Sequence, residues 1–151
     1  MTIGNAQPQF TSNGVVGSVL VTAANTSSQG GGTVATDIWK VITSEATYGT
    51  YIERVDFIPT ATTPTTTTAT VGRVFISSVT SGATTSANTF LIGEVTLPAT
   101  AADNASTAVN AFSVALGIRL PPGYTILVTN HAAPAANTAW RATAFGGDYT
   151  P

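Results

Sequence analysis

The chain offers few side chains that could act as an acid, a base or a nucleophile. Its 151 residues contain one histidine, His131, and no cysteine. A serine–histidine–carboxylate triad would have to use His131, and no Gly-x-Ser-x-Gly elbow presents a serine nucleophile. The absence of cysteine excludes a thiol nucleophile and a thiolate zinc site. A lone histidine at the end of a strand is most often an edge or loop residue, so His131 does not indicate catalysis.

Seven carboxylate side chains are the remaining candidates for acid–base chemistry. A glycosidase needs two of them to face each other across a cleft. Glu53 and Asp56 are an odd number of positions apart in a predicted strand, so we expect them on opposite faces of it. Glu45 and Glu53 could meet across a hairpin, but nothing singles them out as a pair. We expect Glu53, Arg54 and Asp56 to form a salt-bridge cluster instead.

No group of residues has the spacing of a metal or cofactor site. The Asp-x-Asn-x-Asp-Gly pattern of an EF-hand calcium loop is absent, and calcium sites of other kinds in loops stay an open alternative. The glycines at 30–32 are followed neither by a lysine nor by the start of a helix, so they are not a phosphate-binding loop. We therefore predict no catalytic residue, no cofactor and no metal, and we predict that the protein is not an enzyme.

Charge is sparse along the whole chain. Only 8% of the residues are charged, and five Lys and Arg against seven Asp and Glu give a net charge of −2. No basic cluster is present that could bind the phosphates of a nucleic acid or an anionic lipid. The longest apolar run, at 15–24, is interrupted by polar residues, and residues 1–11 lack the pattern of a secretory signal. We expect neither a nucleic acid nor a membrane as a partner.

Alternation of apolar residues with polar or small ones predicts strands instead of helices. The longest example is residues 112–120, in which every second residue is a large apolar one. In a second example, Leu91, Val95 and Leu97 are expected to share one face of a strand, with Ile92 on the other. The predicted strands lie near 14–23, 34–43, 51–58, 71–79, 90–97, 109–120, 124–131 and 138–145.

About eight strands with regular turn signals indicate an all-β fold, a single-domain and jelly-roll-like β-sandwich of antiparallel strands. The Pro-Pro-Gly sequence at 121–123 predicts a type II turn, because proline fixes one φ and glycine supplies a positive one. Trp39 and Trp140 lie in predicted strands, so we expect them in the core, and a sugar-stacking platform is the alternative. We divide the chain into an extended N-terminal arm, residues 1–13, and a sandwich domain, residues 14–151.

The stretch 73–149 resembles small structural proteins encoded by tailed bacteriophages. The resemblance rests on a Gly-Glu-strand-Pro pattern at 93–98, a Leu-Pro-Pro-Gly-Tyr sequence at 120–124 and a Gly-Gly-Asp-Tyr sequence at 146–149. Proteins of this kind are jelly-roll capsid decoration (cement) proteins. They bind the outer surface of an assembled head and stabilise it, often as trimers at three-fold positions.

The resemblance implies a place on the capsid surface of a virion, with synthesis in the cytoplasm of a host bacterium. The implied partners are further copies of the chain, as a homotrimer, and the major capsid protein of the phage. The low charge agrees with this class, because the cores of interfaces are depleted of charged residues. The alternative function is a receptor- or carbohydrate-binding module of a phage tail fibre or spike. Candidate contacts to the capsid or to a neighbouring subunit are Ile3, Gln7, Pro8, Phe10 and Tyr149.

Overall fold

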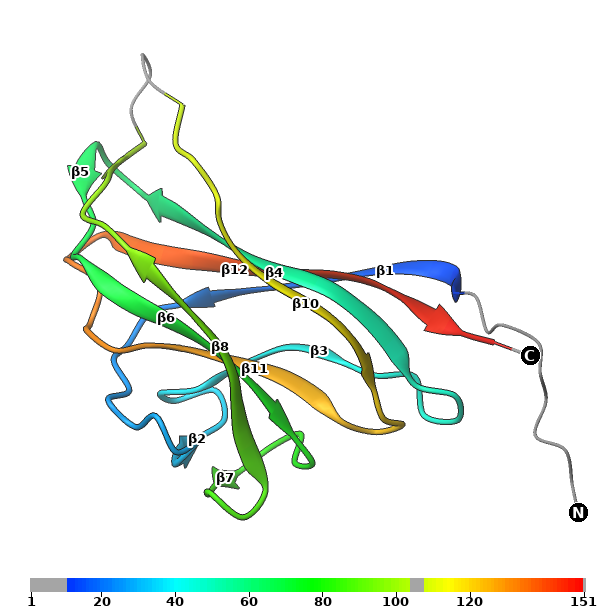
Figure 1. Cartoon of the computed structure of the whole chain (residues 1–151). Coiled ribbons are helices and arrows are strands. Elements are labelled where there is room, and N and C mark those ends of the chain that lie inside the picture. The colour runs from blue at the N-terminus through cyan, green and yellow to red at the C-terminus, as the bar shows by residue number, and fades with distance from the viewer. Residues whose placement is uncertain (1–10, 104–107, 151) are drawn as a thin grey trace, which may run out of the picture.

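The computed structural model describes residues 11–103 and 108–150, which form strands and turns without any helix (Figure 1). The strands of five residues or more in this part of the chain are β1 (Thr11–Val21), β3 (Trp39–Thr43), β4 (Thr50–Ala61), β6 (Thr70–Ser77), β8 (Thr89–Leu97), β10 (Phe112–Leu120), β11 (Thr125–Asn130) and β12 (Thr138–Tyr149). Strands of two residues form two further pairs, β2 (Gly32–Thr33) with β7 (Ala83–Thr84) and β5 (Thr65–Thr66) with β9 (Ala101–Ala102).

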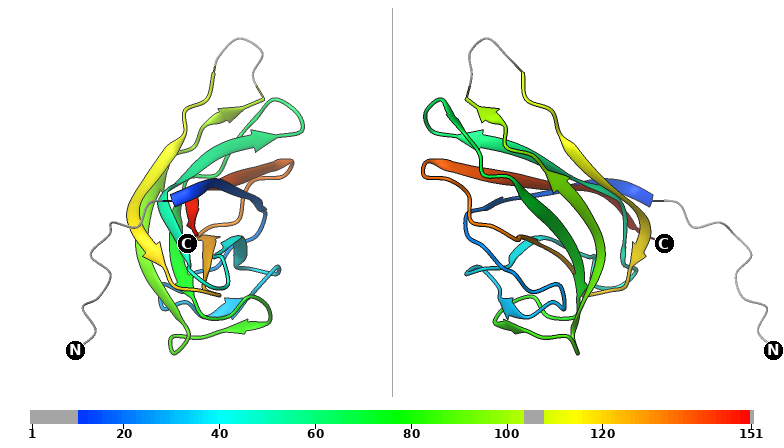
Figure 2. Two further views of the ribbon diagram at one scale, coloured as in Figure 1. Left: turned by 90° about the vertical axis from the view of Figure 1, so that its right-hand side faces the viewer. Right: turned by 60° about the vertical axis from the view of Figure 1, so that its left-hand side comes forward.

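The long strands form two antiparallel sheets, which face each other as the two layers of a sandwich (Figure 2). Sheet A has the strand order β1-β12-β4-β10, and sheet B has the order β3-β11-β6-β8. The predicted all-β fold of antiparallel strands is therefore confirmed for the described residues.

The pairing of the long strands is nested. The first long strand, β1, pairs with the last, β12, and the second, β3, pairs with the second-last, β11. The third and sixth, β4 and β10, pair in the same way, as do the fourth and fifth, β6 and β8. This is the order that results when one long antiparallel ribbon is rolled up into two sheets. We infer a jelly-roll winding from it.

Most strand boundaries differ from those predicted, and the differences at β1, β3 and β12 bear on the predicted arm and on the edges of the sheets. β1 begins at Thr11, so residues 11–13 of the predicted arm pair with the end of β12, and the rest of that arm lies outside the described residues. The strand predicted at 34–43 starts only at Trp39, because the residues before it form a turn with Ala35 at a φ of 69°. β12 continues to Tyr149, past the predicted end at residue 145.

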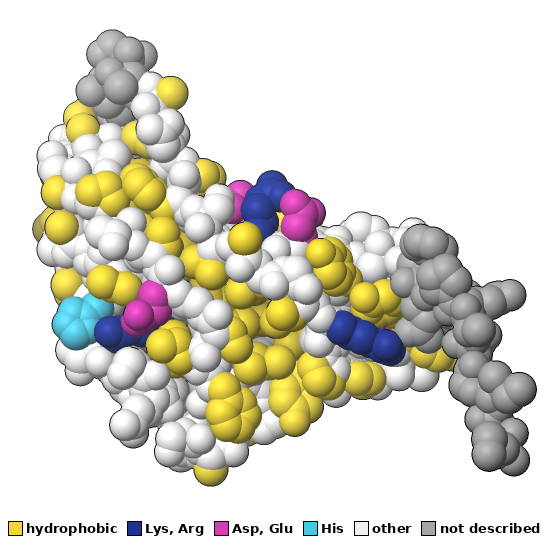
Figure 3. Space-filling model, viewed as in Figure 1, with side chains coloured by type: hydrophobic (Ala, Val, Ile, Leu, Met, Phe, Trp, Pro, Cys, Tyr) yellow, Lys and Arg dark blue, Asp and Glu magenta, His cyan; other side chains and the backbone are white. Residues whose placement is uncertain are grey.

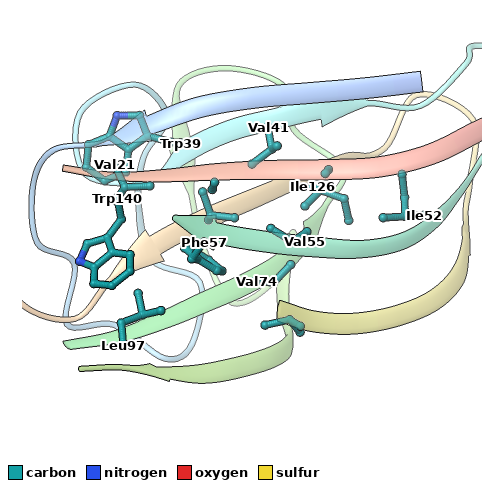
Figure 4. Close-up of a cluster of buried hydrophobic side chains, with 14 of the residues drawn as sticks. Val21, Trp39, Val41, Ile52, Val55, Phe57, Val74, Leu97, Ile126 and Trp140 are labelled. Atoms are coloured by element: carbon teal, nitrogen blue, oxygen red, sulfur yellow. The ribbon is translucent and has the colours of Figure 1, made fainter. Parts of the chain in front are cut away.

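The core fills the space between the two sheets (Figure 4). Trp140 is completely buried and Trp39 is 7% exposed, which confirms both tryptophans as core residues. The ring of Phe112 meets Trp140 edge-on, with the ring centroids 5.8 Å apart, a favoured geometry for aromatic pairs. The other large side chains with no exposed surface that pack in this core are Phe57, Ile52, Leu97, Leu120, Ile126, Val21, Val55 and Val74.

Sheet A contains extra residues at adjacent positions of two neighbouring strands, β4 and β10. Between β12 and β4 the register shifts at Gly146, and Glu53 of β4 is the extra residue. Between β10 and β4 the register shifts again, with residues 116 and 117 opposite Glu53. A Cβ added to Gly146 would lie 2.1 Å from the carbonyl oxygen of Tyr51, so only glycine fits there. Extra residues of this kind are β-bulges, which bend a strand and increase its twist.

The sandwich has two open sides, at which an edge strand of sheet A lies beside an edge strand of sheet B. At each open side a glycine lies where the two sheets come together. On the side of β1 and β3, a Cβ added to Gly17 would be 2.1 Å from the carbonyl oxygen of Val41. On the side of β8 and β10, a Cβ added to Gly93 would be 2.4 Å from Cγ1 of Val114. Any other residue would force a shift of the opposite backbone at Gly17 and a shift of the Val114 side chain at Gly93. The approach of the sheets at both open sides therefore depends on these glycines.

This dependence predicts that Gly17→Ala destabilises the fold by about 1–3 kcal/mol, because the added methyl group collides with backbone that cannot move away alone. The control is Gly14→Ala in the same strand, where nothing lies within 4 Å of the added Cβ. For the control we expect a change below about 0.5 kcal/mol. Urea denaturation measures both variants, and equal free energies of unfolding for the two would contradict the close approach.

Candidate functional site

The predicted cluster of Glu53, Arg54 and Asp56 is present on the outer face of sheet A. Arg54 Nη1 lies 2.7 Å from Glu53 Oε1, and Arg54 Nε lies 3.1 Å from Asp56 Oδ2. The hydrogen bond to Asp56, followed by the attraction of both carboxylates, raises the pKa of Arg54 above its ordinary value. The expectation that Glu53 and Asp56 lie on opposite faces is wrong, because the bulge at Glu53 shifts the alternation. Arg54 pairs with both carboxylates, and the cluster leaves no carboxylate pair across a cleft.

Arg73 has a structural role on the outer face of sheet B. Its side chain is 10% exposed, and its Nε lies 2.7 Å from Glu94 Oε1. Its Nη1 donates hydrogen bonds to the carbonyl oxygens of Asn25 at 3.4 Å and Thr26 at 3.2 Å. Arg73 therefore attaches the segment after β1 to the sheet. This segment leads to a second, small core, made of Ile38, Phe75 and Leu127.

Glu45 closes the turn between β3 and β4. Its carboxylate accepts hydrogen bonds from the backbone N–H groups of Tyr48 and Thr47, the latter at 2.8 Å. These bonds, the one from Tyr48 first, lower the pKa of Glu45 below its ordinary value. The turn also needs Gly49, whose φ is +82°. Glu45 thus holds its own loop and is not aimed at a substrate.

The other acidic and basic groups give no sign of catalysis either. Asp37 accepts a hydrogen bond from the backbone N–H of Thr33 at 2.6 Å, and Asp148 accepts one from the hydroxyl of Thr50. His131 is exposed directly after β11. Within residues 11–103 and 108–150, no three His, Asp or Glu side chains are placed so that they could hold a metal ion.

Tyr149 is the one predicted contact residue that the structure describes. Its ring lies against the guanidinium group of Arg119, with the carbon of that group 4.7 Å from the ring centroid. Its backbone N–H donates to the carbonyl oxygen of Gly49 at 3.1 Å. Tyr149 is half-buried by its own chain, and its contact with a partner stays a prediction. The other predicted contacts, Ile3, Gln7, Pro8 and Phe10, lie outside the described residues.

An exposed apolar surface runs along β8 and β10, at one open side of the sandwich (Figure 3). Phe90 is 49% exposed and Leu91 is 37% exposed, and further residues of the two strands are half-buried. The charged side chains visible in Figure 3 lie around this surface and not within it. An apolar centre with a polar rim is the usual composition of a protein–protein interface. We call this surface the apolar band and define it by the exposed Phe90 and Leu91 and by four half-buried residues that also pack against the core, Ile92, Val95, Leu116 and Ile118.

The sequence prediction placed Leu91 on the same face of the strand as Val95 and Leu97, and this is wrong, because Leu97 is buried and Leu91 is exposed. Val74 pairs with Gly93 and Phe75 pairs with Leu91, so Ile92 is an extra residue in β8. Because of this bulge, Ile92 packs against the core and Leu91 points outward. One signal for the band is present in the sequence, where Phe90, Leu91 and Ile92 are three consecutive large apolar residues. A strand that is buried on one face only cannot direct all three of them toward the core.

No protein family, curated protein or solved structure matches this chain. The described residues contain no helix that is long and apolar enough to cross a membrane. Among the described residues, the apolar band is the strongest candidate for a functional site.

The lowered pKa of Glu45 predicts an acid-dependent loss of stability. A carboxyl group whose pKa is lower in the folded than in the unfolded chain stabilises the fold at every pH above its pKa in the unfolded chain. For Glu45 that unfolded pKa is about 4.5. This contribution disappears as the pH falls through the folded pKa. We therefore expect Glu45→Gln to lower the free energy of unfolding at pH 7 and to have no effect at pH 2.5. Urea denaturation at both pH values measures this, and an equal loss at both would contradict it.

Proposed function

We propose that the protein is a virion structural protein of a tailed bacteriophage, a decoration or cement protein that binds the outer surface of the assembled head and stabilises it. The apolar band is the observation that carries the proposal, because it offers an uncharged surface with a charged rim. The resemblance of residues 73–149 to phage structural proteins supports the same class.

The arrangement of charged groups supports a binding role over a catalytic one. The carboxylates of Glu53, Asp56 and Glu94 are occupied by arginines of the same chain, and Glu45 is occupied by its own turn. The alternative of a carbohydrate-binding module loses its strongest support, because the two tryptophans that would stack on a sugar are buried. A protein that binds a partner through an apolar surface agrees both with the occupied carboxylates and with the buried tryptophans.

We propose a homotrimer as the bound form. The chain exposes 7646 Å², and a specific interface needs roughly 800 Å² from each partner. A subunit of a trimer contributes to two subunit interfaces, and a third patch for the major capsid protein brings the total to roughly 2,400 Å². This is about a third of the surface of the chain, so the sandwich is large enough for both kinds of contact.

The proposal predicts that Leu91→Asp weakens re-binding to undecorated heads at least about tenfold, because the partner would have to bury an unpaired carboxylate. The control is Thr96→Asp, which adds the same charge at an exposed position of β8 that is not part of the band. We expect the control to bind within about twofold of the unmodified protein. Co-sedimentation of labelled protein with heads measures both, and equal binding of the two variants would contradict a role of the band.

The sparse charge predicts that attachment is insensitive to salt. Screening at 1 M salt shortens the range of electrostatic attraction to about 3 Å, but it does not weaken apolar contacts. We therefore expect the amount of protein bound to heads to stay constant between 0.1 and 1 M NaCl. A strong decrease over this range would indicate an electrostatic attachment and would contradict the proposed mode of binding.

A further inference from the structure

The edge strand β1 differs from the other sheet edges that the structure describes. Natural edge strands avoid further pairing by being short, by carrying charges or by containing bulges. β3 has five residues and carries Lys40, β8 has a bulge and Glu94, and β10 has a bulge and Arg119. Each of these three edges is therefore protected by features of its own sequence and register.

β1 has none of these features after its first residues. It is eleven residues long, and its sequence contains neither a charged residue nor a proline. Its pairing with β12 is regular from Asn13 to Val21. Its outer face presents Val16 at 66% exposure and Leu20 at 38% exposure. A long, regular and uncharged edge is a template for the addition of another strand.

An arginine points across this strand. Arg141 of β12 is exposed and pairs with Leu20 of β1. Its Nη1 reaches Ser18 of β1, where it donates a hydrogen bond of 3.3 Å to the hydroxyl oxygen. The ion pairs among the described residues hold Arg54 and Arg73 but do not include Arg141. A guanidinium group with free donors above the edge strand is suited to a carboxylate that arrives beside β1.

A groove at the end of β1 continues this surface. It has a volume of about 430 Å³ and lies between the end of β1, the end of β4 and the start of β12. Leu20 and Arg141 line it together with the side chains of Thr22, Thr60 and Thr138. Leu20, Ala61 and Ala139 make part of its lining apolar, and Arg141 adds one cation, so it can receive an apolar or acidic side chain of an added strand.

We infer that β1 accepts an extended segment of a partner protein as an additional strand of sheet A, with an Asp or Glu of that segment bound to Arg141. Charge complementarity to Arg141 is the ground for taking an acidic segment of a partner protein as the occupant in place of a second β1. A second copy of β1 would bring no carboxylate, since its sequence TSNGVVGSVLV contains none. The inference does not depend on the capsid proposal, because it concerns another side of the sandwich and a partner defined by its chemistry.

The test uses the ¹⁵N-labelled full chain and two synthetic heptapeptides, acetyl-Thr-Val-Asp-Val-Thr-Val-Thr-amide and its counterpart with Asn in place of Asp. NMR titration gives both the affinity and the binding position. We expect the Asp peptide to shift the amide signals of residues 14–21 and to bind at least about fivefold more tightly than the Asn peptide, because its carboxylate makes charge-assisted hydrogen bonds. For Arg141→Gln we expect equal affinities for the two peptides.

A second variant separates strand addition from a contact of Arg141 alone. Val16→Lys places a charge on the edge strand and is expected to abolish binding of both peptides, as edge lysines do in natural sheets. The spectrum of each variant without peptide shows that its fold is intact. The inference is overturned if no signals of β1 shift at millimolar peptide, if the shifts map to β3, β8 or β10, or if the unmodified protein binds both peptides equally.

Discussion

Extra residues in the strands determine which side chains this sandwich buries and which it exposes. Of the six pairings between long strands, all except that of β11 with β6 contain a register shift. A single extra residue in a strand can move the residues that follow it to the other face, because the side-chain period of a strand is two. The bulge at Glu53 brings three charged side chains together on one face, and the bulge at Ile92 turns Leu91 outward. The salt-bridge cluster and the apolar band are therefore consequences of register.

Register also explains how much of the fold could be predicted from the sequence. The alternation at 112–120 is long enough to identify its buried face, and the structure packs these apolar residues against the core. The turn at 121–123 follows from proline and glycine alone, and Gly123 has a φ of +77°. The opposite faces predicted for Glu53 and Asp56 failed because a bulge depends on the partner strand, which the local sequence does not contain.

The candidate site was less accessible to sequence reasoning than the fold. The predicted contacts lie mainly in the arm, of which residues 1–10 are outside the described part of the chain. Tyr149 is described, and it packs against Arg119 of its own chain. The apolar band was missed because the prediction assumed regular alternation in residues 90–97, and the extra residue Ile92 breaks it. An outward apolar residue can be recognised only when the register of its strand is known.

The few charges of the chain have two different roles. Glu53, Arg54, Asp56, Arg73 and Glu94 are paired within the chain, and together they leave a net charge of only −1. Such a chain has little electrostatic repulsion to keep copies apart, and the protection of its edges falls to bulges, short strands and single charges. Three edges have this protection, and β1 does not. In a protein that must stay dispersed before it assembles, an unprotected edge is tolerable if a partner strand covers it in the assembled state. The uncompensated Arg141 above β1 fits this condition, because a single cation discourages like copies and selects a partner that carries a carboxylate.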